Sequence, residues 1–189
     1  MDIRKGYVYH IKDEYFELVK DKTLMINLED GKSRPTYFCI KNENTNILWF
    51  IPMSSKVEKY RLIRNKKLEK YGRCDTILIR KFLGKESVFL IQNMFPTTEK
   101  FVDHVHIING VEAKVINSIA AEIEITFNKL MRLIEKGKKV VFKDIEKDIA
   151  IMMEELKKIV INNVGTKSRI KNRTAANKSR RFGTHRVPN

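Results

Sequence analysis

The sequence predicts an α+β fold: a small antiparallel β-barrel or curled sheet, decorated with helices and followed by C-terminal helices. Short segments rich in aromatic and β-branched residues dominate the first two thirds of the 189 residues, and helical spacing of apolar residues takes over from Ile116. A chain of this length can bury a hydrophobic core and suits one domain with an appendage. We therefore expect a folded domain over 1–164 and a basic tail over 165–189.

Five segments have the composition of β-strands and are bounded by turn residues. They are Gly6–Ile11, Thr36–Ile40, Ile47–Pro52, Thr76–Ile79 and Ser87–Gln92. The polar run from Asn42 to Asn46 predicts a hairpin loop. Asn109-Gly110 predicts a type I′ hairpin, because both central positions of that turn require positive φ.

Two helices are predicted in the last third of the chain. Apolar residues recur at helical spacing from Ile119 to Ile134, and Gly137 is a suitable C-terminal stop. Asp144 can cap a second helix, whose apolar stripe is formed by Ile145, Ile149, Met152, Leu156 and Ile159.

The charge of the chain is strongly positive, with 38 lysines and arginines against 23 acids and a net charge of +15. Such an excess fits a polyanionic partner. Eight of the cations, and no acid, fall in 165–189, where few apolar residues could support a core. That segment is either a solvated tail or an arm that orders on nucleic acid, and the sequence leaves both readings open.

The stretch Pro52-Met53-Ser54-Ser55-Lys56 joins a predicted strand to a predicted helix. Ser55 and Glu58 fit an S-x-x-E capping box, so the helix should begin at Lys56 and end near Tyr71, before Gly72. It carries seven cations and two acids. A helix N-terminus flanked by serine hydroxyls and lysines suits a phosphate group. Capping alone would account for Ser55, but not for the density of positive charge.

Familiar nucleotide, metal and hydrolase motifs are missing from the sequence, which contains no GxxxxGK[ST], GxGxxG, HExxH or GxSxG. The histidines lack metal-ligand spacing, and His104 and His106 are interpreted as structural or solvent-facing. Cys39 and Cys74 are expected to be reduced thiols. No apolar run approaches the ~18 residues of a membrane-spanning helix, and the N-terminus lacks a signal-peptide core. We expect a cytoplasmic protein that uses no metal, cofactor or membrane.

Three segments, in their order and spacing, resemble the toxins of type III toxin–antitoxin systems, the ToxN/AbiQ/CptN group, and most of all its CptN branch. They are RPTYFCI, ILWFIPMSSKVEKY and FLIQNMFPTT. The family signature is a strand that ends in Pro-x-Ser/Thr-Ser before a lysine, with Asn-Met-x-Pro downstream. Here these motifs are Pro52–Lys56 and Asn93–Pro96, and the resemblance extends from Met1 to the end of the helix that starts near Ile116.

The resemblance implies a metal-independent, sequence-selective endoribonuclease on a compact MazF/Kid-like, SH3-like barrel. In this family the ribose 2′-OH attacks the adjacent phosphate and leaves a 2′,3′-cyclic phosphate and a 5′-OH. The inhibitor is a small repetitive antitoxin RNA with a pseudoknot fold, which the toxin cuts from its precursor and keeps bound in a closed toxin–RNA hetero-oligomer. Cellular and phage RNAs are the substrates, and the outcomes are growth arrest and abortive infection by phage.

Carried over residue by residue, the resemblance places the family's hydroxyl pair at Ser54 and Ser55 and its lysine at Lys56. Several relatives have a proline between the second hydroxyl and the lysine, so Lys59, one helical turn further on, competes for the role. RNA contacts are expected from Lys32, Arg34, Thr36, Tyr60, Arg61, Arg64, Lys66, Lys67, Asn93, Arg180 and Arg181. The alternative is a non-catalytic basic RNA- or DNA-binding module whose cations only neutralise phosphates.

Overall fold

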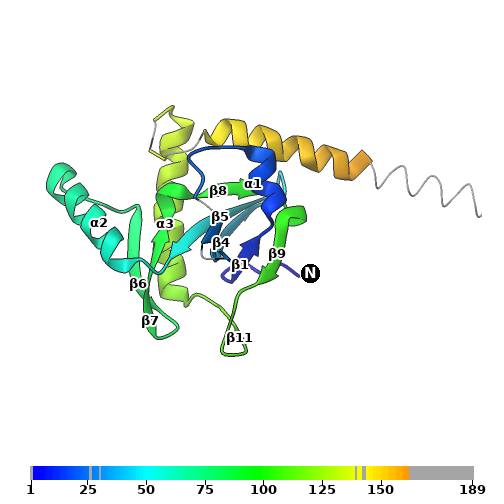
Figure 1. The fold of residues 1–189 in the computed structure, drawn as a ribbon. Coiled ribbons are helices and arrows are strands. Elements are labelled where there is room, and N and C mark those ends of the chain that lie inside the picture. Colours follow the sequence, from blue (N-terminus) through cyan, green and yellow to red (C-terminus); the bar gives the residue numbers. More distant parts are fainter. Residues whose placement is uncertain (1, 26, 30, 139, 142–143, 162–189) are drawn as a thin grey trace, which may run out of the picture. The chain divides into compact units, whose positions relative to one another are not determined.

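The computed structural model describes residues 2–25, 27–29, 31–138, 140–141 and 144–161, and it has the predicted α+β architecture (Figure 1). Residues Met1–Met152 form one compact unit and Met153–Asn189 a second. The first unit contains an antiparallel sheet with α1 (Asp13–Val19), α2 (Val57–Tyr71) and α3 (Asn117–Glu135) around it. A further helical segment covers 145–161. The predicted domain boundary after residue 164 lies outside the described residues.

The main sheet has seven strands, and all of its pairs are antiparallel. Its order is β6 (Ile77–Phe82), β7 (Lys85–Leu90), β5 (Ile47–Ser54), β4 (Thr36–Asn42), β1 (Val8–Ile11) and β9 (Val102–Val105), and β8 (Phe95–Thr97) also pairs with β5. Within the described chain the end strands β6 and β9 do not pair with each other, so this sheet is open. The closure that the predicted barrel requires is not confirmed.

Two small ribbons accompany the main sheet. One pairs β2 (Leu28–Glu29) with β3 (Lys32–Ser33), and the other pairs β10 (Ile107–Ile108) with β11 (Val111–Glu112). Asn109 and Gly110, between β10 and β11, have φ angles of 53° and 78°. These positive values confirm the predicted type I′ geometry.

Strand β5 is central, and one of its edges changes partner along its length. The first edge pairs with β4 from Ile47 to Pro52, whereas the second pairs first with β8 and then, at Met53 and Ser54, with β7. The Met53 N–H donates to the Pro35 carbonyl on the β4 side, at 3.0 Å. Because backbone groups alternate between the two edges of a strand, the nitrogen of Pro52 faces the second edge, where the partner changes. Pro52 has no N–H, so at this position it removes no hydrogen bond between strands.

All eight residues of β5 are buried, because the sheet is covered on both faces. On one face the Trp49 ring contacts Phe127 of α3, with ring centroids 5.4 Å apart. On the other, the Phe50 ring lies 5.2 Å from Phe38 and 6.1 Å from Phe95. Helix α1 closes this second face through Tyr15, whose hydroxyl donates to a strand carbonyl at 2.9 Å.

The predicted helices agree with the structure at most of their ends. Helix α2 ends before Gly72, which adopts the left-handed conformation. Of the predicted apolar stripe of α3, Ile119, Ile123, Phe127 and Leu130 are buried and Ile134 is half-buried. The Lys147 N–H donates to the Asp144 side chain at 3.2 Å, as expected for a cap. Helix α1 has no counterpart in the sequence prediction.

The two cysteines are free thiols, as expected. Cys39 is buried, and its burial raises the pKa of the thiol to about 12. Among the described helices, none is long and apolar enough to cross a membrane.

Candidate active site

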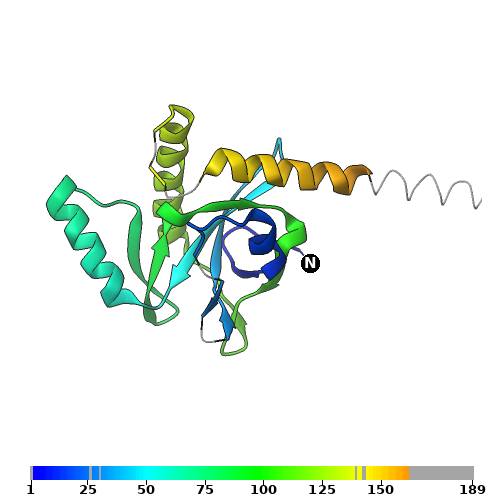
Figure 2. The same cartoon turned by 45° about the horizontal axis from the view of Figure 1, so that its top comes forward.

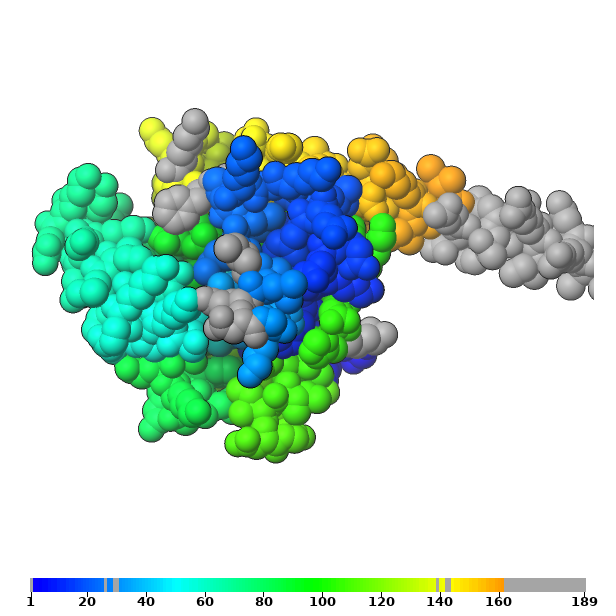
Figure 3. Space-filling view, viewed as in Figure 1, coloured from blue at the N-terminus to red at the C-terminus, as the bar shows by residue number. Residues whose placement is uncertain are grey.

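A pocket of about 380 Å³ lies where the end of β5 meets the segment that precedes β4. The end of β5 and the two residues before α2 supply one wall, Met53–Lys56, and the other wall consists of 32–35. The two walls meet because β4 and β5 are antiparallel neighbours, with Thr36 opposite Pro52. Figure 3 shows the light-blue segment around residue 32 beside the cyan start of α2.

Hydrogen bonds fix the two walls of the pocket against each other. The Met53 N–H donates to the Pro35 carbonyl at 3.0 Å, and Arg34 Nη1 donates to the Met53 carbonyl at 3.1 Å. The Arg34 N–H in turn donates to the Asn27 carbonyl at 2.7 Å. The segment that carries Arg34 is therefore anchored at both its backbone and its side chain, which sets a guanidinium at the end of β5.

The two serines of the pocket have different environments. Ser54 ends β5, is 8% exposed, and accepts a hydrogen bond from the Lys56 N–H at 3.2 Å through its Oγ. Ser55 is exposed, and its side chain makes no hydrogen bond within the described part of the chain. Ser54 thus orients the turn between strand and helix, whereas the Ser55 hydroxyl is accessible to a molecule in the pocket.

The predicted capping box of Ser55 and Glu58 is wrong. Helix α2 begins at Val57, and its N-cap residue is Lys56, which makes no side-chain capping bond. Ser55 therefore precedes the cap, and Glu58 stands at the second helical position rather than the third that the box requires. Glu58 is instead paired with Arg61, one turn along the helix, at 3.3 Å.

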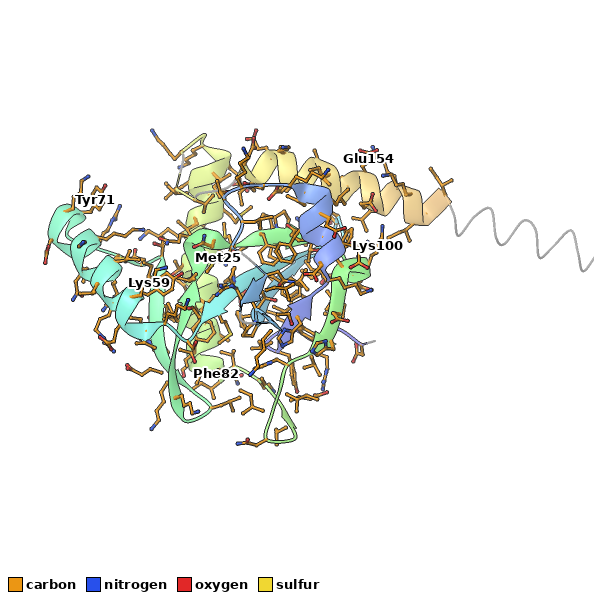
Figure 4. All side chains as sticks on the ribbon, viewed as in Figure 1. Met25, Lys59, Tyr71, Phe82, Lys100 and Glu154 are labelled. Carbon is orange, nitrogen blue, oxygen red and sulfur yellow. The ribbon has the colours of Figure 1, made fainter. Side chains whose placement is uncertain are left out.

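Of the two candidate lysines, the structure brings Lys56 to the pocket and not Lys59. Lys56 is exposed at the pocket wall. Lys59, labelled on α2 in Figure 4, is not in the lining, and its Nζ lies 5.6 Å from the centre of the Tyr60 ring. With Lys32 and Arg34, Lys56 gives the lining three cations, and none of the described lining residues has a carboxylate. This balance favours a phosphate over any neutral or cationic ligand.

Two of the predicted RNA contacts do not line the pocket. Thr36 is 2% exposed, and its hydroxyl donates to the Tyr9 carbonyl at 3.0 Å, which gives it a structural place in the sheet. Asn93 is half-buried in the short 3-10 helix Ile91–Asn93. The predicted contacts Arg180 and Arg181 lie outside the described residues.

The remaining predicted contacts follow α2, away from the pocket. Arg61 pairs with Glu58 and with Glu86, the latter at 2.9 Å. Lys67 donates to Gln92 and lines a second pocket of about 350 Å³ near the C-terminal end of α2. The other members of this group are Tyr60, Arg64 and Lys66, of which Tyr60 packs against a core cluster of β6 and β7.

A histidine cluster next to the pocket was not assigned to the site from the sequence. The Ser33 Oγ, in the pocket wall, lies 2.6 Å from His10 Nδ1, and His10 Nε2 lies 2.8 Å from His106 Nδ1. The ring of His104 stacks on that of His10, with centroids 4.5 Å apart. Burial, and then the neighbouring histidines, lower the pKa of His10 to about 4, and burial also lowers the pKa of His106. The alternation of His104 and His106 was the one sequence signal of this cluster.

The fold and the pocket define a class of protein: an α+β domain with a phosphate-suited pocket at the junction of a central strand and a basic helix. A comparison with solved structures finds the same fold in AbiQ, a lactococcal anti-phage endoribonuclease belonging to the type III toxin–antitoxin system. The match has a TM-score of 0.56 at 15% identity, and it covers 72% of this chain and 88% of AbiQ. No protein-family model and no curated protein sequence matches the chain. The predicted resemblance is thus confirmed at the level of the fold.

Proposed function

We propose that this protein is an endoribonuclease toxin of a type III toxin–antitoxin system, with its active site in the pocket formed by 32–35 and 53–56. The observation that carries this proposal is the meeting of two adjacent serines with three cations, on a fold shared with AbiQ. The pairing of β4 with β5 brings these groups together although they are distant in sequence.

The groups of the pocket suit attack by a ribose 2′-OH on the adjacent phosphate. In that reaction the O2′–P bond forms and the P–O5′ bond breaks, which leaves a 2′,3′-cyclic phosphate and a 5′-OH. The nucleophile belongs to the substrate, so the protein has to orient it and to stabilise the extra negative charge of the phosphorane. We assign the first task to Ser55 and the second to Lys56, Lys32 and Arg34, all of which line the pocket.

The same proposal includes the partners of the protein. A small repetitive pseudoknot RNA would occupy the pocket and the basic surface of α2, and the toxin would process its precursor and stay bound in a closed toxin–RNA hetero-oligomer. Two observations support these partners. The net charge of the chain is +15, and no residue of α2 is buried, so the cations of this helix are accessible to a ligand. Cellular and phage RNAs would be cut in the cytoplasm of the host, arresting growth and aborting phage infection, with no metal or cofactor.

The test is to incubate the purified protein with RNA in the presence and absence of EDTA and to map the product ends. Cleavage in both conditions, with 2′,3′-cyclic phosphate and 5′-OH termini, is the expected result. The alternative function, a non-catalytic RNA- or DNA-binding module, predicts retention of intact nucleic acid. Cleavage only without EDTA would refute the metal-independent mechanism.

A further inference from the structure

Among the residues that the structure describes, the pocket lining contains no group that ordinarily titrates near neutral pH. Its described lining offers serine hydroxyls, two lysines and one arginine, but no histidine and no carboxylate. Lysine and arginine are protonated at pH 7, and a serine hydroxyl is too weak a base to hold a proton. Attack by a 2′-OH nevertheless releases a proton, and a general base typically contributes about 100-fold to 10,000-fold in rate. The acceptor for that proton therefore has to be sought behind the lining.

One continuous set of hydrogen bonds leads from the lining to such a group. Ser33, in the pocket wall, contacts His10 at 2.6 Å, and the other nitrogen of His10 contacts His106 at 2.8 Å. His10 is buried on β1, whereas His106 is half-buried just after β9. The bonds thus connect the pocket, through a buried ring, to a histidine with access to solvent.

Resting on the proposed function, we propose that Ser33, His10 and His106 form a proton relay that serves as the general base of the pocket. Before the reaction, the Ser33 hydroxyl donates to His10 Nδ1, and the His10 Nε2–H donates to His106 Nδ1. The proton of the 2′-OH passes to the Ser33 oxygen, that of Ser33 to His10 Nδ1, and that of His10 Nε2 to His106. His106 releases its added proton to solvent, while the leaving O5′ takes a proton from the Lys56 ammonium, which regains one from water.

The surroundings of His10 keep it in the state that a relay requires. Only a neutral imidazole has one donor and one acceptor nitrogen, so a protonated His10 would interrupt the chain. The groups that face it are Ser33 from β3, His104 from β9, His106 just after it, and the Asp103 carboxylate. Burial, and then His104 and His106, lower the pKa of His10 to about 4. They outweigh the Asp103 carboxylate and the Ser33 backbone, which both favour the charged ring. The ring is therefore neutral at pH 7.

The test compares Ser33→Ala, Ser33→Thr and His10→Gln with wild type in single-turnover cleavage of an RNA oligonucleotide between pH 4.5 and 9, alongside the affinity for the same RNA. We expect Ser33→Ala and His10→Gln to lose about 100-fold or more in rate, with RNA affinity within a few-fold of wild type. Ser33→Thr keeps the hydroxyl and should recover most of the rate. The acidic limb of the wild-type profile, which reports protonation of His106, should vanish in Ser33→Ala.

His104→Gln is the matched control, because that ring stacks on His10 and yet lies outside the hydrogen-bonded chain. Its rate at neutral pH should stay within a few-fold of wild type. If wild type cleaves RNA and Ser33→Ala cleaves equally fast with an unchanged pH profile, the relay is refuted while the proposed function stands, whether or not His10→Gln folds. If wild type does not cleave RNA at all, the proposed function fails and the relay fails with it.

Discussion

Replacing Ser55 by alanine separates the chemistry of the pocket from the stability of the fold. The Ser55 side chain is exposed and makes no hydrogen bond within the described residues, and it does not cap α2. Exposed substitutions of this kind change the free energy of unfolding by about 0.5 kcal/mol or less. Loss of an N-cap, in contrast, would have cost about 1 kcal/mol. We therefore expect Ser55→Ala to unfold at nearly the temperature of wild type.

The effect on cleavage should be far larger. A hydroxyl that orients the 2′-OH or donates to the phosphorane is worth on the order of 2.7 to 4 kcal/mol in the transition state, or at least 100-fold in rate. The assay is single-turnover cleavage of a labelled RNA, with RNA affinity and thermal unfolding measured on the same preparation. Ser55→Thr should retain part of the activity, because it keeps a hydroxyl in the same place.

Ser54→Ala is the informative comparison. It removes the acceptor of the Lys56 N–H, at 3.2 Å, next to a buried strand end, so it should lower the free energy of unfolding by about 1 kcal/mol. A cleavage rate for Ser55→Ala within a few-fold of wild type, together with normal folding, would show that the catalytic assignment of this serine is wrong.

Four further outcomes are expected. Lys56→Ala should reduce the cleavage rate much more than Lys59→Ala, because only Lys56 lines the pocket; equal losses in single-turnover assays would contradict this. RNA affinity should fall steeply between low and moderate salt as counterions are released, and a flat titration would count against phosphate contacts. Removing 165–189 should weaken RNA binding yet leave cooperative unfolding intact, and loss of that cooperativity would show the segment to be part of the folded domain. The free energy of unfolding should decline as the pH falls from about 6.5 to about 4, because His10 gains a proton near its ordinary pKa in the unfolded chain but only near pH 4 in the folded protein. Calorimetry should show a shallower decline in His10→Gln.

The strands and helices were largely predictable because their signals are local. Strand-like composition, turn residues and the helical spacing of apolar residues can all be read from short stretches of sequence. These patterns located β4, β5 and α3 to within a few residues. Helix α1 was missed because its seven residues have little periodicity of their own and are held by contacts such as the Tyr15 hydroxyl on a distant strand. Whether the sheet is open or closed depends on whether its two end strands pair with each other. The sequences of such short strands do not indicate this pairing.

The site was predictable where a motif marked it and not where tertiary structure assembled it. The adjacent serines and their lysine stand out in the sequence, and the structure does bring them to one pocket with Lys32 and Arg34. The helix start was placed one residue too early, and this shift removed the expected role of Ser55 as a cap. The contact between Ser33 and His10 joins a residue of the β2–β3 ribbon to a residue of β1 in the main sheet, so no spacing in the sequence could have revealed it.

Helix α2 connects the charge of the sequence with the proposed partner. None of its 15 residues is buried. The helix lies beside β6 and β7 (Figure 2), and half-buried side chains such as Val57 and Ile63 pack against the core cluster of these strands. A helix that is polar all round gains little from packing, and like charges one turn apart cost it a few tenths of a kcal/mol per pair. Arg61 offsets part of this cost through its two glutamates, whereas Lys66 and Lys70 stand four residues apart as like charges. Because these cations destabilise the helix, a polyanion that binds along it best accounts for their presence. The pocket beside the N-terminal end of the helix is where the backbone of that polyanion would be cut.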